Sequence, residues 1–213
     1  MASNELLVLN RADLVGLNVT WKEVIDVLDD AFKQKAQGLV QNPPKPKIAS
    51  RDDSFIHAMP AYLGGSDRIG IKWVAGYESN VEKGLPYIYG AVILNDADTG
   101  RPIALLDGGW VTEMRTPGAS GVTMRHVPVD AKRLAVVGFG VQGQRHVEVA
   151  LEEHPDIESI TIFDRDPSKY DALKAIAGDR EIAMAGSPTE CVEGVDIAIT
   201  TITVPLDPKL DCR

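Results

Sequence analysis

Hydrophobic and polar residues follow different patterns in the two halves of the chain. In the first half, four runs rich in β-branched and aromatic residues are separated by turn-forming residues rather than by helical segments. They cover residues 55–60, 68–77, 87–94 and 102–106. Strands that follow one another without intervening helices predict a largely antiparallel or mixed sheet.

Helical periodicity flanks these strands on both sides. Thr20 and Glu23 have the spacing of a capping box, which marks the start of a helix. Five apolar residues then recur at helical spacing and predict one buried face: Val24, Val27, Leu28, Ala31 and Phe32. After the strands, Thr116 and Pro117 allow two interpretations. They are either the cap and first residue of a helix that runs to about residue 126, or part of a longer, kinked helix.

A proline-rich segment precedes the strands. Residues 41–47 (QNPPKPK) contain three prolines, which lack a backbone N–H and restrict the residues before them. The segment is therefore predicted to be an extended connection. From spacing alone, Lys45 within it is an ordinary solvated charge.

The second half opens with a glycine motif in a specific context. An unbroken apolar run over residues 133–137, typical of a buried parallel strand, leads into Gly138, Gly140 and Gly143. A potential helix follows over residues 141–153. In dinucleotide-binding folds such glycines permit a tight turn, let the backbone approach a pyrophosphate and let helix and strand pack closely, while the helix N-terminus binds the phosphates. We therefore predict a dinucleotide site, the alternative being a glycine-rich turn in another α/β unit.

Strands and helices alternate after the glycines, which predicts a parallel sheet with right-handed crossovers. Further strands are expected at residues 159–164, 181–185 and 195–203, with helices at 167–177 and 188–193. Asp164 ends the second strand 21 positions after Gly143, where an acidic side chain accepts hydrogen bonds from the adenosine ribose and favours NAD over NADP. Arg165 beside it leaves room for NADP.

These elements predict an α/β protein in which a partial Rossmann-type parallel sheet of about four strands is preceded by an α+β domain. The expected domains are residues 1–128 and 129–213. A complete six-stranded dinucleotide fold needs two more strands, so we expect the second domain to be truncated.

Composition limits the classes of partner. The chain has 213 residues, 44% of them hydrophobic and 25% charged, as in ordinary globular proteins. A net charge of −9 argues against nucleic acid, and no apolar run approaches the ~18 residues of a membrane span. The N-terminus lacks the pattern of a secretory signal. Cys191 and Cys212 are too few for a disulfide framework or a metal cluster. We expect a cytoplasmic protein without a metal site.

Several short motifs occur in the order and spacing of one family. They are Met59 to Tyr62, Gly70 to Trp73, Asn80, Gly84 to Pro86, Asp98 to Pro102, Leu106-Asp107, Thr112 to Thr116 and Gly138 to Gly143. In combination they resemble the ornithine cyclodeaminase/μ-crystallin family. Its members include ornithine cyclodeaminases, amino acid dehydrogenases, ketimine reductases and opine-type synthases. The resemblance implies a first domain for substrate binding and dimerisation and a second for NAD(P) binding.

The resemblance also implies roles for individual side chains. Lys72 and Arg115 match the catalytic residues that hold the α-carboxylate and α-nitrogen of an amino or imino acid near the nicotinamide. A guanidinium grips a carboxylate bidentately, and a lysine adds a point charge that can exchange protons. Lys45 stands where members have a second carboxylate-binding arginine. A lysine there keeps the positive charge but lacks the paired N–H donors with which a guanidinium binds a carboxylate.

His57 departs from the pattern of ornithine cyclodeaminases, which have a glutamate there for the distal amine. A histidine does not supply that fixed negative charge, which weakens the case for ornithine. It leaves a spacer or proton-transfer role, or a strand histidine satisfied by hydrogen bonding. The candidate substrate-binding residues are Lys45, His57, Lys72 and Arg115. The candidate cofactor-binding residues are Thr112, Gly138, Gly140, Val141, Gln142, Gly143, Asp164, Arg165 and Thr201.

The implied function is hydride transfer between NAD(H) and the α-carbon of an amino or imino acid, by a homodimer. The reaction is either the conversion of ornithine to proline and ammonia, a lyase reaction, or a related dehydrogenase or ketimine reductase reaction. The family's catalytic aspartate lies beyond the fourth Rossmann strand, after the last residue of this chain. The alternative is therefore a non-catalytic NAD(P)H- or small-ligand-binding protein like μ-crystallin, or an inactive fragment.

Overall fold

The computed structural model describes residues 5–202 and divides the chain into two compact units, residues 1–119 and 120–213. Residue 203, the predicted end of the last strand, and Cys212 lie outside the described residues. Among the residues that are described, no helix has the length and apolar character needed to cross a membrane. Residues 5–202 also hold no group of three or more His, Cys, Asp and Glu side chains placed to bind a metal.

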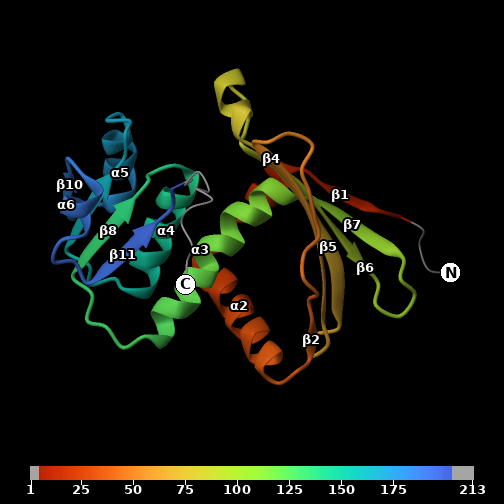
Figure 1. Ribbon diagram of the computed structural model, residues 1–213. Helices are drawn as coiled ribbons and strands as arrows, with labels where there is room; N and C mark the ends of the chain where they lie inside the picture. The colour runs from red at the N-terminus through yellow and green to blue at the C-terminus, as the bar shows by residue number, and fades with distance from the viewer. Residues whose placement is uncertain (1–4, 203–213) are drawn as a thin grey trace. The chain divides into compact units, whose positions relative to one another are not determined.

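The described part of the first unit contains a seven-stranded sheet (Figure 1). Its strands are β1 (Leu7–Leu9), β2 (Val40–Gln41), β3 (Lys47–Ile48), β4 (Ser54–Leu63), β5 (Arg68–Tyr77), β6 (Ile88–Asn95) and β7 (Pro102–Asp107). The order is β1-β7-β6-β5-β4-β2, and β3 also pairs with β4. Only the β1–β7 pair is parallel, which confirms the predicted mixed sheet. A 3₁₀ helix, η1 (Glu78–Lys83), joins β5 to β6.

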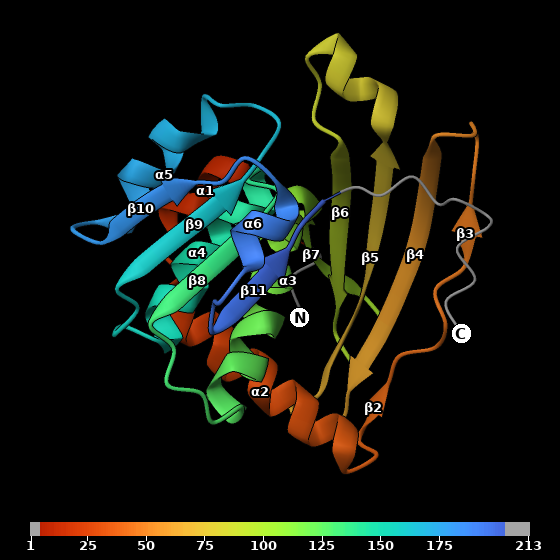
Figure 2. The same cartoon turned by 60° about the vertical axis from the view of Figure 1, so that its left-hand side comes forward.

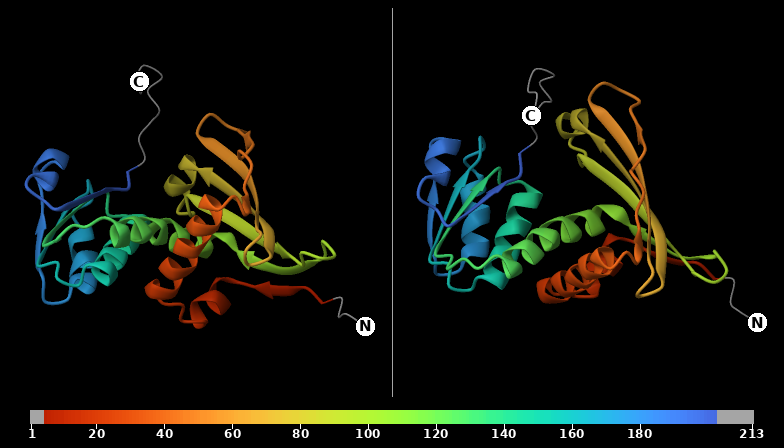
Figure 3. Two further views of the ribbon diagram at one scale, coloured as in Figure 1. Left: turned by 90° about the horizontal axis from the view of Figure 1, so that it is seen from below. Right: turned by 60° about the horizontal axis from the view of Figure 1, so that its bottom comes forward.

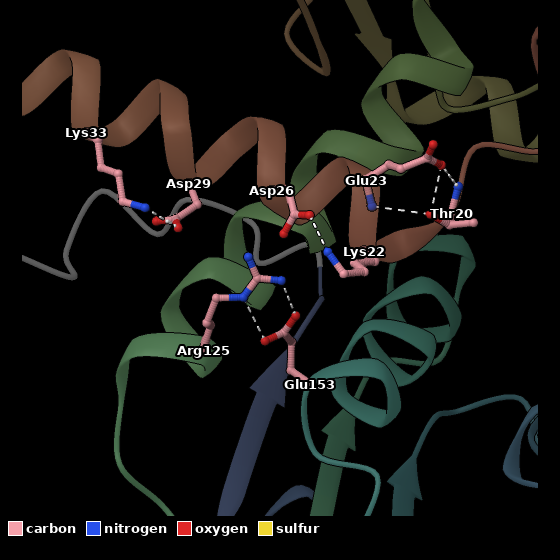
Figure 4. Close-up of polar contacts among 8 residues, drawn as sticks. All are labelled: Thr20, Lys22, Glu23, Asp26, Asp29, Lys33, Arg125 and Glu153. Atoms are coloured by element: carbon pink, nitrogen blue, oxygen red, sulfur yellow. Dashed lines mark hydrogen bonds and ion pairs between the residues drawn. The ribbon is translucent and has the colours of Figure 1, made fainter.

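Two helices lie between β1 and β2 in the chain, α1 (Arg11–Gly16) and α2 (Trp21–Ala36). The predicted capping box of α2 is present: the Thr20 hydroxyl accepts a hydrogen bond from the Glu23 N–H, and the Glu23 carboxylate accepts one from the Thr20 N–H at 2.8 Å (Figure 4). Two ion pairs one turn apart, Lys22–Asp26 and Lys33–Asp29, run along the helix. An exposed pair such as Lys22–Asp26 adds only a few tenths of a kcal/mol.

The predicted buried face of α2 is partly wrong. Val27 and Phe32 are 68% and 50% exposed, whereas Ile25 is fully buried. The helix docks partly through polar contacts that a hydrophobic pattern does not reveal. The buried Gln34 side chain, for example, accepts a hydrogen bond from the Gly65 N–H at 3.0 Å, at the turn that follows β4.

The longer of the two predicted versions of the next helix is the correct one. α3 (Gly108–His126) is continuous through Pro117 (Figure 3). The middle of α3 lies close against α2: a Cβ atom on Gly118 would be 2.6 Å from Val24 Cγ1 and 2.7 Å from Leu28 Cδ1. α3 crosses from the first unit into the second, between Ala119 and Ser120.

The described part of the second unit contains a four-stranded parallel sheet ordered β10-β9-β8-β11 (Figure 2). Its strands are β8 (Arg133–Val137), β9 (Ser159–Phe163), β10 (Glu181–Met184) and β11 (Ile197–Thr200). The helices between them are α4 (Val141–Glu153), α5 (Lys169–Ala177) and α6 (Pro188–Val192). This confirms the predicted partial Rossmann sheet, and the glycine motif lies between β8 and α4.

The core of the second unit follows from its sequence. Residues 134–137 of β8 are buried on both faces, as expected for a central parallel strand. On one face, Ala135 and Val137 pack with Cys191 of α6. Arg125 at the end of α3 forms a bidentate ion pair with Glu153 of α4, with N···O distances of 2.7 and 3.1 Å (Figure 4).

Candidate functional site

The glycine motif adopts the geometry that its sequence predicts. Gly138 has a φ of 90°, a conformation that favours glycine, and its N–H donates to the Phe163 carbonyl at 2.7 Å. A Cβ on Gly143 would collide with the Gly138 carbonyl oxygen, so only glycine lets α4 start this close to β8. Gly140 precedes the first residue of α4 and faces open space. The loop therefore leaves room for a ligand at the second glycine.

Asp164 lies against this loop. One carboxylate oxygen accepts a hydrogen bond from the Phe139 N–H at 2.7 Å, and the other accepts one from the Asp166 N–H at 3.0 Å. A carboxylate has about four acceptor positions. Two are used by the backbone, and the remaining capacity suits two vicinal hydroxyl groups such as those of a ribose. Arg165 beside it is exposed.

The other candidate cofactor-binding residues of the second unit also surround the motif. Thr201 follows β11, and its hydroxyl donates to the Gly138 carbonyl at 2.6 Å, which closes the loop from the side. Val141 is the first residue of α4 and is exposed. Gln142 is half-buried in the first turn of α4. Thr112 is the exception, because it belongs to the first unit.

A contact that sequence reasoning missed supports the same turn of α4. The buried His146 ring places Nδ1 2.7 Å from the Gln142 carbonyl and Nε2 3.1 Å from the Ser120 hydroxyl of α3. A carbonyl only accepts, so Nδ1 carries the proton, and burial lowers the pKa of the ring and keeps it neutral. Nε2 then accepts from Ser120. The sequence contains no signal for this pair, since nothing in it brings residues 120 and 146 together.

The candidate substrate residues converge in the first unit. Lys72 of β5 lies on the same face of the sheet as the buried Val74, two residues along the strand. α3 lies close to this face at its first residue, because Gly108 has no room for a Cβ beside the Gly90 backbone of β6. Lys72 donates from Nζ to the Thr112 hydroxyl of α3 at 3.3 Å. Arg115 follows Thr112 by one helical turn.

Electrostatics show that three cations share this site. The pKa of the half-buried Lys72 is lowered from 10.5 to about 8, first by desolvation and then by the positive charges of Arg115 and Lys45. Desolvation also lowers the pKa of Arg115, although by solvent-accessible surface this residue is exposed. Arginine stays protonated even when its pKa is lowered. The three side chains therefore form a positive site that an anion would stabilise.

Polar and apolar surfaces meet beside Lys72. A hollow of about 190 Å³ adjoins it, and its lining includes the apolar side chains of Met59, Ala61, Val92 and Leu94. His57 lies on the same face of the sheet as Lys72. It pairs with Val74, two residues along β5 from Lys72, which pairs with Met59. An anion-binding group next to an apolar hollow suits a small ligand with a carboxylate at one end.

The fold and the sites define a class of protein. One unit carries a glycine loop between the first strand and first helix of a Rossmann-type sheet, and the other gathers the charges of Lys45 and Arg115 near Lys72. The chain belongs to the ornithine cyclodeaminase/mu-crystallin family, whose model matches residues 5–207.

Known proteins similar to the chain include enzymes of amino and imino acid chemistry. The nodulation efficiency protein NfeD of Rhizobium meliloti is 36% identical over 92% of this chain and 59% of its own length. A structure of Thermococcus litoralis Δ(1)-pyrroline-2-carboxylate reductase with NADH and L-proline is 33% identical, with a TM-score of 0.85, and matches 91% of this chain and 61% of its own. An archaeal alanine dehydrogenase dimer with bound NAD is 28% identical, with a TM-score of 0.82 over 92% of this chain and 60% of its own. The chain thus spans about three fifths of the length of these relatives.

Proposed function

We propose that this chain provides the substrate site and the cofactor loop of an oxidoreductase that transfers hydride between NAD(H) and the α-carbon of an amino or imino acid. The observation that carries the proposal is the set of three cations, Lys45, Lys72 and Arg115, in a protein whose second unit has a dinucleotide loop. A dehydrogenase or imine reductase reaction is favoured over ornithine cyclodeamination. His57 replaces the glutamate expected for a distal amine, and the reductase relative is 33% identical.

The residues of the chain divide the chemical tasks. Arg115 and Lys45 hold the substrate carboxylate, Arg115 through a fork geometry that lysine lacks. Lys72 holds a proton next to the substrate nitrogen, because its lowered pKa allows it to give up or take up that proton near neutral pH. NAD(H) supplies the hydride when bound. In the reductive direction the substrate C=N bond gains that hydride on carbon and one proton on nitrogen.

The loop fits NAD(H) as the cofactor. Gly140 leaves open space where a pyrophosphate approaches the start of α4, and Asp164 retains acceptor capacity for the ribose hydroxyls. A 2′-phosphate in place of the hydroxyl would face the Asp164 carboxylate and be repelled. We therefore propose that NAD(H) binds more tightly than NADP(H).

Titration with NADH and NADPH, followed by nicotinamide fluorescence, tests this proposal. Gly140→Val fills the open space at the loop and should weaken NADH binding by more than about tenfold, equivalent to ~1.4 kcal/mol. Gly16→Val is a matched control, since Gly16 also has no neighbour within 4 Å but lies in the first unit. Wild-type affinity in Gly140→Val would contradict the proposed loop.

A panel of amino and imino acids then tests the reaction. Lys72→Met should abolish turnover and leave the NADH affinity within about twofold of wild type. Unchanged turnover in this variant would overturn the role of Lys72. NADH binding without turnover of any substrate would instead support the alternative of a non-catalytic binding protein.

We also propose a homodimer formed through the outer face of the first unit's sheet. Alternate residues of β5 and β6 expose large apolar side chains on the face opposite Lys72. Trp73 and Tyr89 are 46% and 47% exposed, and Ile69 is exposed on the same face. Contiguous exposed apolar surface of this kind marks an interaction site, and a relative of known structure is a dimer.

A further inference from the structure

His57 is held in place from two sides. Its Nδ1 lies 3.2 Å from the Pro46 carbonyl, and its ring lies 5.0 Å from the Phe55 ring, tilted by 40°. Phe55 is itself fixed, because it packs over Gly76, where a Cβ would collide with its ring, and meets the Tyr87 ring edge-on at 6.5 Å. The histidine therefore links an aromatic wall on β4 to the proline-rich segment.

That segment carries Lys45. β3 pairs Lys47 with His57, and Met59 pairs with Lys72 on the other side of β4. Continuing this antiparallel register two residues back from Lys47 would bring Lys45 level with Met59. The lysine charge acts on Lys72 from there. Next to Lys45, the structure shows a side-chain hydrogen bond from His57 to the carbonyl of Pro46.

We propose that His57 is a positioning residue: its ring, braced by Phe55, holds the Pro46 carbonyl and thereby places Lys45 beside Lys72. This role differs from direct recognition of the distal end of a substrate. The carbonyl accepts only, so Nδ1 must carry a proton in either charge state of the ring. Proline removes a backbone donor on either side of Lys45, so a side-chain donor adds a contact that the backbone there does not supply.

Two amide variants, His57→Asn and His57→Gln, each mimic the position of one ring nitrogen and so separate the hydrogen bond from the bulk of the ring. Asparagine places its amide N–H at the position of Nδ1, whereas glutamine places it at the position of Nε2. His57→Asn should therefore retain the contact with Pro46, and His57→Gln and His57→Ala should lose it. Lys45→Gln removes the charge itself. Lys47→Gln is the control, because Lys47 flanks Pro46 on the other side and is not among the charges that lower the Lys72 pKa.

The readout is the pKa of Lys72, measured by ¹³C NMR on the reductively methylated protein, without cofactor or substrate. We expect about 8 in wild type, His57→Asn and Lys47→Gln. Lys45→Gln, His57→Ala and His57→Gln should each raise it, and the double variant His57→Ala/Lys45→Gln should match Lys45→Gln alone. Unshifted signals of the other lysines establish that each variant is folded.

Three results would overturn the proposal. A wild-type Lys72 pKa in His57→Ala would mean that Lys45 keeps its place without the histidine. An unchanged pKa in Lys45→Gln would mean that Lys45 does not act on Lys72. A larger rise in the double variant than in Lys45→Gln would mean that His57 acts on Lys72 directly.

The kinetic consequence rests on the proposed function. His57→Ala should raise KM for the carboxylate substrate by about the same factor as Lys45→Gln, with kcat changed little, and His57→Asn should restore KM. The NMR titration needs no turnover. Failure of the proposed reaction would leave its result intact, so the two hypotheses can be rejected separately.

Discussion

At the scale of single residues, the positive charges of Lys45, Lys72 and Arg115 repel one another in the first unit. Desolvation lowers the pKa of Lys72 most, and the positive charges of Arg115 and Lys45 lower it further. A bound carboxylate would offset the repulsion among all three cations. The lowered pKa of Lys72 makes the charge of this group depend on pH near 8.

We predict that affinity for a carboxylate ligand falls as pH rises through about 8, because the ammonium form of Lys72 is then lost. The apparent pKa in kcat/KM, which reports the free enzyme, should lie near 8 as well. The Kd of a carboxylate inhibitor between pH 6.5 and 9.5 measures the effect. Lys72→Arg should give a flat profile over this range, since arginine stays charged.

The lowered pKa of Lys72 also determines whether the stability of the fold rises or falls with pH. Between about pH 8 and 10.5 the unfolded chain binds more protons at Lys72 than the folded one, so stability should rise with pH in that window relative to Lys72→Met. A wild-type affinity profile that is flat to pH 9.5, or a difference in stability that falls over the window, would contradict the lowered pKa.

For the candidate sites, the sequence predicted individual residues but not the contacts between them. Gly138, Gly140 and Gly143 were predicted from the spacing of the motif. The structure shows a steric reason for glycine at Gly138 and Gly143, whereas Gly140 faces open space. Lys72 and Arg115 came from family resemblance, since a lone strand lysine carries no signal. The bond from Asp164 to the Phe139 N–H and the link from His57 to Pro46 depend on tertiary placement, which no local pattern encodes.

At the scale of elements, regular hydrophobic patterns predicted most strands and helices to within one or two residues. The errors lie where tertiary contacts override local preference. At Pro117 the sequence left two versions of α3 open, and the structure has the longer one, which packs against α2 at Gly118. Polar contacts rather than the apolar stripe alone orient α2, which leaves Val27 and Phe32 exposed. Short strands such as β2 and β3 have no periodicity to read.

The crossing of α2 and α3 makes an element-scale prediction. Replacing glycine by alanine inside a helix normally stabilises it by roughly 0.5–1 kcal/mol. At Gly118 the new methyl group would lie 2.6 Å from Val24 and 2.7 Å from Leu28, and overpacking of this kind costs about 1–3 kcal/mol. Steric cost should exceed helix propensity, so Gly118→Ala should lower the free energy of unfolding in urea denaturation.

Gly16→Ala provides the comparison, because Gly16 is helical and has no neighbour within 4 Å of the added methyl group. This variant should be neutral or slightly stabilising. If Gly118→Ala proved as stable as Gly16→Ala, the close approach of α2 and α3 at residue 118 would be incorrect.

At the scale of the whole molecule, the sequence predicted two units of different architecture because the change from antiparallel to alternating patterns is abrupt. It did not predict which face of the first sheet would remain exposed. Strand residues of both faces are apolar, as Ile69, Ile71 and Val74 of β5 illustrate, so alternation alone does not separate them. The structure distinguishes the two faces, because Val74 on one face is buried and Trp73 on the other is exposed.

This exposed face leads to the last prediction. If it is the dimer interface, the wild-type chain should sediment at twice its 23.0 kDa mass. Trp73→Glu places a charge at the centre of the apolar face and should shift the equilibrium towards monomer by at least about tenfold, since burying an unpaired carboxylate costs several kcal/mol. Analytical ultracentrifugation over a range of concentrations measures both masses and the dissociation constant.

Val127→Glu tests whether any exposed apolar residue would serve equally well. Val127 is 50% exposed, close to the 46% of Trp73, but follows α3 in the second unit rather than lying on the sheet. It should leave the dimer intact. Dissociation by Val127→Glu together with an unaffected Trp73→Glu would move the interface to the second unit, and a monomeric wild-type chain at all concentrations would reject self-association. Because Trp73 and Lys72 are neighbours on opposite faces of β5, a dimer through Trp73 would cover one face of the sheet and leave the other to the substrate.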